Sequence, residues 1–206
     1  MISEKRKCIF LLLPKTGTSS IVRVINTDER YKTDEWQFTN YQGRRHYDTI
    51  HPKYNNFYKV AGKRNPYDRV VSLWRYWNIQ FEQREIETYN FREFVKNISK
   101  VSHTVACTMG WENRIHFATC VDSVLISTNG DFTHEQIDYW VALESLQKDF
   151  NYVCDKIGSS KIQLPHRNRT NHNQPHYTEY YDDETRQIVA KKYARDIEYF
   201  GYEFGE

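Results

Sequence analysis

The sequence of 206 residues contains no apolar run of membrane-spanning length, and its first residues do not form a secretory signal. The apolar stretch near the amino terminus is too short for a signal peptide, and no small-residue cleavage site follows it. These two absences argue against a membrane protein and predict a soluble cytoplasmic chain. The alternative is a lumenal domain excised from a longer protein.

Cysteine is scarce, and its spacing fits neither a metal site nor a redox motif. The four cysteines, Cys8, Cys107, Cys120 and Cys154, lie far apart and form no CxxC pair. Without a secretory signal, reduced and buried thiols are expected. In an excised lumenal domain, Cys107 and Cys120 would be the pair expected to form a disulfide.

Acidic and basic residues nearly cancel over the whole chain, which leaves a formal net charge of +2. Their distribution is uneven: residues 1–75 carry 15 lysines and arginines against 7 acidic residues, whereas residues 76–206 carry 14 against 20. A basic first third favours the binding of phosphates or other polyanions. The basic residues form no stripe interleaved with aromatic ones, so nucleic acid is not an expected partner.

No repeat, low-complexity tract or long linker divides the chain, so a single domain over residues 1–206 is predicted. Buried-strand patterns alternate with helical ones, which predicts an α/β fold with a central parallel sheet flanked by helices. Strands are predicted at residues 8–13, 57–63, 122–127 and 139–143, and helices at 18–25, from 65 onward, at 146–157 and from about 182 to 200. In such a sheet, ligands bind at the carboxyl ends of the strands.

What the chain does contain is a strand, a glycine turn and a helix in immediate succession, CIFLLLPKTGTSSIVRVI at residues 8–25. Free amide N–H groups and the positive end of the helix dipole attract an anion at such a turn. Hydroxyl side chains add neutral donors, and a lysine adds one charge. The residues predicted to hold an anion in this P-loop-like turn are Lys15, Thr16, Gly17, Thr18, Ser19 and Ser20.

The turn is not a Walker A motif, in which the lysine follows the second glycine. Here Lys15 lies two residues before the only glycine of the turn. No aspartate clearly ends a later strand where it could bind Mg²⁺, so no metal is expected. A kinase-like enzyme with Mg²⁺-dependent ATP turnover is therefore an alternative that the position of Lys15 argues against.

The segment LPKTGTSSI resembles the 5′-phosphosulfate-binding loop of sulfotransferases that use 3′-phosphoadenosine 5′-phosphosulfate (PAPS). The segment GKRNPYDRVVSLW, residues 62–74, resembles the strand and helix that bind the 3′-phosphate in this family. There an arginine and a serine eight positions later contact the 3′-phosphate, and Arg64 and Ser72 have this separation. Residues 138–150 and 180–204 are similar to the closing segments of the carbohydrate branch, the Golgi-type enzymes close to uronyl and chondroitin sulfotransferases.

The resemblance implies transfer of a sulfuryl group from PAPS to an acceptor hydroxyl, with a carbohydrate as the expected acceptor. Lys15 is placed to neutralise the charge that develops on the leaving phosphate. The acceptor hydroxyl must lose its proton to a general base. The segment GRRHYDTIH, residues 43–51, resembles the one that supplies this base in uronyl-type sulfotransferases, with His46 as the best match and His51 as the second choice.

The polar loop after residue 158 allows two interpretations. His166, His172 and His176 could form a zinc site, but no acidic or cysteine ligand accompanies them. A loop that folds over the cofactor, with Arg167 or Arg169 near a phosphate, is favoured instead.

Simpler explanations exist for several of these residues. Arg64 could pair with Asp68, Ser72 could be a small packing residue, and Lys15 could be an exposed turn lysine. A further alternative is a non-catalytic protein that binds a phosphorylated nucleotide. The acceptor specificity would depend on residues 26–56 and 79–116, where the sequence shows the least pattern.

Overall fold

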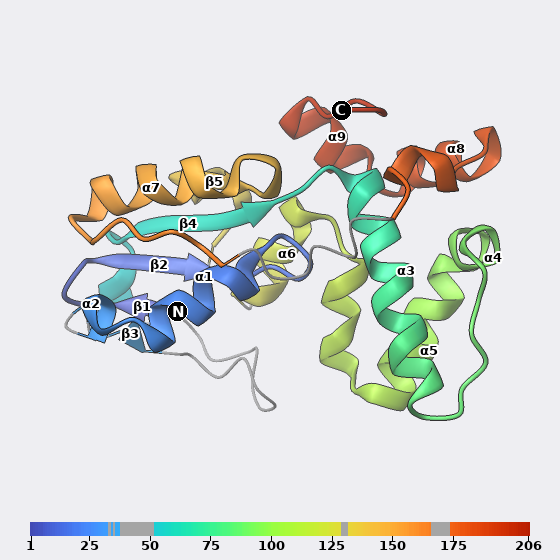
Figure 1. Cartoon of the computed structure of the whole chain (residues 1–206), viewed down its shortest axis with the longest axis horizontal. Coiled ribbons are helices and arrows are strands. Elements are labelled where there is room, and N and C mark those ends of the chain that lie inside the picture. The colour runs from blue at the N-terminus through green and yellow to red at the C-terminus, as the bar shows by residue number, and fades with distance from the viewer. Residues whose placement is uncertain (33, 35, 38–51, 129–131, 166–173) are drawn as a thin grey trace. The chain divides into compact units, whose positions relative to one another are not determined.

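The computed structural model describes residues 1–32, 34, 36–37, 52–128, 132–165 and 174–206 (Figure 1). Contacts within the chain divide it into two compact units. The first, called the sheet unit here, comprises Met1–Lys63 and Cys120–Arg169. The second, called the helical unit, comprises Arg64–Thr119 and Thr170–Glu206.

A five-stranded sheet in the order β3-β1-β2-β4-β5 forms the centre of the sheet unit. The strands are β1 (Ile2–Ser3), β2 (Cys8–Leu11), β3 (Trp36–Gln37), β4 (Tyr58–Lys63) and β5 (Tyr139–Ala142). Strands β2, β4 and β5 are parallel, whereas β1 pairs antiparallel with both β2 and β3. The predicted α/β fold with a central parallel sheet is confirmed. The two short strands β1 and β3 were not predicted, because two residues are too few to show a strand period.

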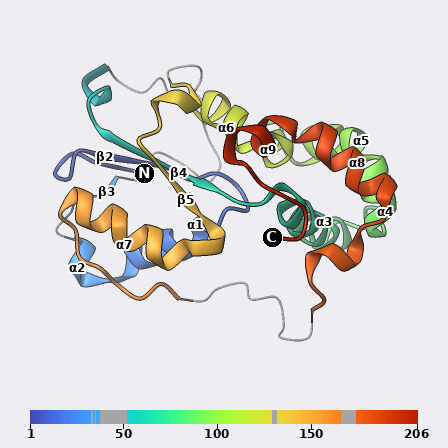
Figure 2. The ribbon, with the colours of Figure 1, turned by 90° about the horizontal axis from the view of Figure 1, so that it is seen from above.

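Helices flank this sheet on both faces (Figure 2). They are α1 (Thr18–Thr27), α2 (Glu29–Lys32), α6 (Cys120–Ser127) and α7 (Leu146–Ile157), with short 3-10 helices at Pro52–Tyr54, His134–Gln136 and Leu143–Ser145. Apolar side chains of α1 and α7 pack against those of β2, β4 and β5, such as Phe10, Val60 and Val141. Helix α7 has the predicted bounds and ends at Gly158, whose φ of 66° suits a left-handed helix cap.

Residues 122–127 lie within helix α6, so the predicted strand there is wrong. A short apolar run such as DSVLIS fits a buried strand and a buried helix equally well by periodicity. The helix buries Cys120, Val121 and Val124 along one side and leaves Leu125 48% exposed. A strand buried on both faces would have covered Leu125 as well.

The helical unit is built around α3 (Pro66–Glu82). Its other helices are α4 (Phe91–Lys96), α5 (Ile98–Met109), α8 (Asp183–Lys192) and α9 (Ala194–Phe200), with 3-10 helices at Trp111–Phe117 and Tyr177–Tyr180. Helix α3 starts as predicted: Pro66 takes the first position, and the Asn65 side chain accepts a hydrogen bond from the Tyr67 N–H at 3.0 Å. Val70, Leu73 and Trp77 of its predicted core stripe are buried, while Trp74 is partly buried.

The last helical segment is divided at Tyr193, although one continuous helix was predicted. Tyr193 ends α8 and begins α9 with φ −109° and ψ 23°. The Ile197 N–H still donates to the Tyr193 carbonyl at 3.1 Å, so helical hydrogen bonding continues across the break, and Ile197 is partly buried in register with the buried Val189 and Tyr193. The sequence period therefore could not reveal it.

Two further properties concern the whole chain. In the part of the chain that the structure describes, no helix combines the length and the apolar character needed to cross a membrane. All four cysteines are free thiols, and three of them are buried as expected. Cys107 is exposed, contrary to the expectation of burial.

Candidate functional site

The predicted anion-binding turn joins β2 to α1 at the carboxyl end of a parallel strand. Gly17 is the N-cap of α1 with φ 81°, and no side chain of the described residues caps this helix. In the first helical turn the Ser20 N–H donates to the Gly17 carbonyl at 3.2 Å, while the amide N–H groups of a helix start point out of the helix and carry the positive end of its dipole. The start of α1 is therefore suited to hold an anion.

Lys15 adopts a left-handed backbone conformation with φ 66°. This conformation costs a residue other than glycine roughly 1–2 kcal/mol, and such strain clusters at functional sites. The Lys15 side chain is half-buried, whereas Ser19 is exposed and Ser20 is buried. The turn thus places a lysine and the exposed hydroxyl of Ser19 within a few residues of the uncapped helix start.

The inner side of the turn is held by its own hydroxyl groups. Thr16 is 1% exposed, and its Oγ1 donates to the Leu13 carbonyl at 2.8 Å. Thr18 Oγ1 donates to the same carbonyl at 3.3 Å. Of the four predicted hydroxyls, these two therefore hydrogen-bond within the turn itself.

In the helical unit, Arg64 precedes Asn65, the N-cap of α3, and Ser72 lies about two turns into that helix. Arg64 donates from Nε and Nη2 to Asp68 Oδ2 at 2.9 and 2.8 Å. The pairing with Asp68 that was an alternative explanation for Arg64 is thus observed. The guanidinium of arginine has five N–H donors in a fixed plane, so a carboxylate partner also orients it for a second anion.

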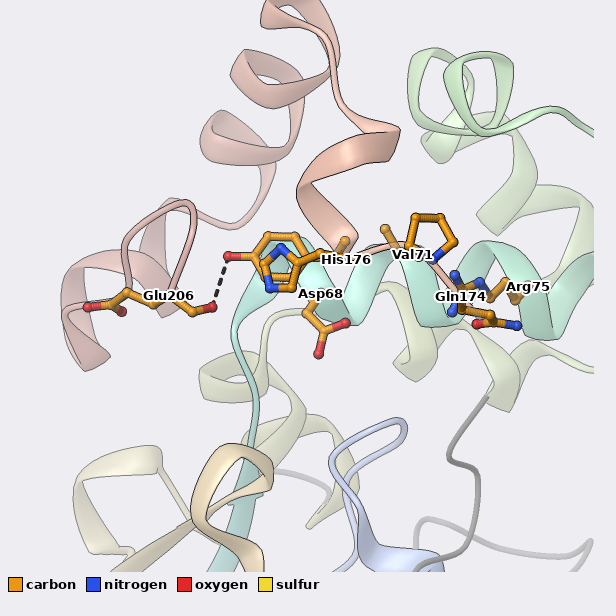
Figure 3. A pocket seen from close by; sticks show the side chains of 8 residues that line it. Asp68, Val71, Arg75, Gln174, His176 and Glu206 are labelled. Atoms are coloured by element: carbon orange, nitrogen blue, oxygen red, sulfur yellow. Dashed lines mark hydrogen bonds between the residues drawn. The ribbon is translucent and has the colours of Figure 1, made fainter. Parts of the chain in front are cut away.

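A cavity of about 260 Å³ lies on a neighbouring face of α3 (Figure 3). Its lining comprises Asp68, Val71, Arg75, Gln174, Pro175, His176, Tyr177 and Glu206. The Tyr177 hydroxyl donates to the Glu206 carbonyl at 3.1 Å and accepts from the Gly205 N–H at 2.7 Å. This cavity was not predicted. Asp68, Val71 and Arg75 share one face of α3 by helical spacing, but this spacing alone does not indicate a cavity.

The predicted site residues fall into three groups. Residues Lys15 to Ser20 span the turn after β2 and the start of α1 in the sheet unit, whereas Arg64 and Ser72 lie just before and within α3 of the helical unit. His46, His51 and Arg167 lie outside the described residues, as do His166, His172 and Arg169. His176 of the histidine cluster is described, and its Nδ1 lies 2.8 Å from Thr178 Oγ1. Within the described ranges, no three histidine, cysteine, aspartate or glutamate side chains are grouped so that they could hold a metal ion.

Comparison with known proteins gives one match. The model of a family described as the sulfotransferase family matches residues 1–203, nearly the whole chain. No curated protein and no solved structure matches the sequence significantly.

Proposed function

The chain belongs to the sulfotransferase family, and on this premise we propose that it transfers the sulfuryl group of PAPS to a hydroxyl group of a carbohydrate. The main support is the turn between β2 and α1. Its helix start has no side-chain cap, and a strained lysine lies two residues before the capping glycine. This arrangement offers amide donors and one positive charge to a phosphosulfate group.

Arg64 and Ser72 are proposed to bind the 3′-phosphate. Arg64 is only 14% exposed, and Asp68 holds its guanidinium through two N–H groups. A partly buried and oriented arginine forms a stronger hydrogen bond with phosphate than a mobile surface arginine does. PAPS carries one phosphate at the 5′ position and one at the 3′ position of its ribose. The turn between β2 and α1 is proposed to provide donors for the first, and Arg64 and Ser72 for the second. Arg167 is proposed as a further phosphate ligand.

PAPS supplies an activated sulfuryl group on a phosphate leaving group. As the bond between sulfur and the phosphate oxygen breaks, Lys15 is proposed to neutralise the charge that develops on that oxygen. His46 is proposed to accept the proton of the attacking hydroxyl, with His51 as the second choice. A sulfuryl group carries less negative charge than a phosphoryl group, so this scheme uses no metal ion. The products would be the sulfated acceptor and 3′-phosphoadenosine 5′-phosphate (PAP).

The decisive experiment compares the affinities of PAP and adenosine 5′-phosphate for the protein by isothermal titration calorimetry. PAP should bind more tightly, because only PAP can engage Arg64 and Ser72. Arg64→Ala should weaken PAP binding by about tenfold or more, since a charge-assisted hydrogen bond is worth ~1.5–3 kcal/mol. The same change should leave the affinity for adenosine 5′-phosphate nearly unaltered.

Arg84→Ala is the matched control, because Arg84 is an exposed arginine just beyond the other end of α3. It should leave PAP affinity unchanged. Equal affinities of the wild-type protein for PAP and adenosine 5′-phosphate would refute the proposed 3′-phosphate site. If PAP binds as expected but no hydroxyl acceptor receives sulfate from PAPS, the chain is a nucleotide-binding protein and not an enzyme.

A further inference from the structure

Gly62 of β4 lies against the anion-binding turn. A Cβ atom added to Gly62 would stand 2.3 Å from Thr16 Oγ1 and 2.9 Å from Thr16 Cβ, both closer than non-bonded atoms approach. Gly62 is not among the residues with positive φ, so its backbone conformation does not require glycine. Position 62 requires glycine because a larger residue would occupy the space that the turn after β2 needs. Glycine within a strand often marks such a close approach of another segment.

The group that fills this space is the Thr16 side chain. It is 1% exposed, and its hydroxyl proton is directed to the Leu13 carbonyl at 2.8 Å. A hydroxyl has a single proton to donate. The Thr16 side chain therefore hydrogen-bonds to Leu13 within the turn on one side and packs on β4 on the other.

We propose that Thr16 and Gly62 are a positioning pair, in which the missing side chain at 62 allows Thr16 to seat the turn on β4. This seating sets the orientation of Lys15 and of the amide groups around Gly17. In this proposal the backbone of Thr16 contributes to the anion site, while its side chain packs on β4 and does not contact the anion. The inference rests on the proposed function, because its consequence is measured as binding of PAP.

The test is a double-mutant cycle read out by PAP affinity and, in parallel, by thermal unfolding without ligand. Gly62→Ala should weaken PAP binding by about tenfold or more, as overpacking of a tight contact does. Thr16→Ala removes Oγ1, the nearer of the two clashing atoms, and keeps Cβ, so adding Gly62→Ala to it should cost less than in the wild-type background. Thr16→Ser is the matched control: it keeps Oγ1, and Gly62→Ala should cost as much in it as in the wild type.

Equal costs of Gly62→Ala in the wild-type and Thr16→Ala backgrounds would overturn the pairing. If Gly62→Ala alone fails to fold, a folded Thr16→Ala/Gly62→Ala double variant supports the pairing, and a double variant that also fails to fold overturns it. If the wild-type protein does not bind PAP, the proposed function fails. The thermal unfolding measurements then test the contact by themselves. The pairing is supported if Gly62→Ala lowers the unfolding midpoint less in the Thr16→Ala background than in the wild type, and it is overturned if the two decreases are equal.

Discussion

Lys15 and Lys7 are both lysines with a left-handed backbone, with φ values of 66° and 51°, but only Lys15 lies in the anion-binding turn. We expect Lys15→Ala to lower kcat by about a hundredfold, because the leaving phosphate loses its charge partner. PAP affinity should change little, since the amide groups at the start of α1 remain. Steady-state kinetics and calorimetry measure the two effects separately.

Lys7→Ala is the control for the cost of this backbone conformation. This variant replaces a lysine that also has a positive φ but lies away from the anion-binding turn. It should leave both kcat and PAP affinity unchanged. A Lys15→Ala variant with wild-type turnover would show that another group stabilises the leaving phosphate.

The proposed general base is tested by the pH dependence of turnover. If a histidine accepts the proton, the rate should rise with pH through a histidine-like pKa, near ~6.5 before any perturbation. His46→Ala should abolish this rise and spare PAP affinity. A variant that keeps the rise, while His51→Ala loses it, would assign the base to His51. If neither variant loses it, another group accepts the proton.

Among the elements, α8 has a well-defined amino-terminal cap. The Asp182 carboxylate accepts a hydrogen bond from the Thr185 N–H at 2.7 Å, and the Thr185 hydroxyl contacts the same residue. Asp182→Ala should lower the midpoint of thermal unfolding by about 2–4 °C. Asp183→Ala, at the next position of the same helix, removes an exposed aspartate that does not cap it and should have a smaller effect.

The pH dependence of this effect follows from the same contacts. Hydrogen bonds from the Thr185 backbone, and then from its side chain, lower the pKa of Asp182 in the folded state. The stabilisation should therefore be fully present above the unfolded pKa of about 3.9 and lost as the pH falls through the lower, folded value. Unfolding midpoints of wild-type protein and Asp182→Ala should differ at neutral pH and converge in acid. A constant difference down to the acid limit would contradict this assignment.

At the scale of the whole molecule, partly buried tyrosines are expected to set an alkaline limit to stability. The chain has 16 tyrosines. Burial raises the pKa of Tyr58 to about 12 and raises that of Tyr181 well above its usual value. A raised folded pKa contributes stability that is present below the unfolded pKa of about 10 and is lost as the pH rises through the folded value.

We therefore expect the protein to unfold cooperatively in alkali, with buried tyrosines ionising as it unfolds. Near-ultraviolet absorbance reports tyrosine ionisation, and circular dichroism reports helix content in the same titration. A late group of tyrosines should ionise in step with the loss of helix. Complete tyrosine ionisation while the helices persist would contradict the prediction.

The sequence by itself determined the features that depend on neighbouring residues. Asn65 and Pro66 specify the start of α3, and Gly158 marks the end of α7, because caps and left-handed turns are governed by a few adjacent residues. The alternation of strands and helices determined the α/β class for the same reason. The candidate turn, with its lysine and hydroxyls, could likewise be recognised from one continuous segment.

The tertiary structure decided what depends on contacts between distant segments. Residues 122–127 are helical because one side of that helix packs against β4 within the sheet unit while Leu125 stays exposed, which an apolar run alone cannot show. The contact of Gly62 with Thr16 could not be predicted either, because nothing in the residues around either position specifies the other. Local signals are set by bonds and hydrogen bonds along the chain, whereas close packing depends on which segments the folded chain brings together.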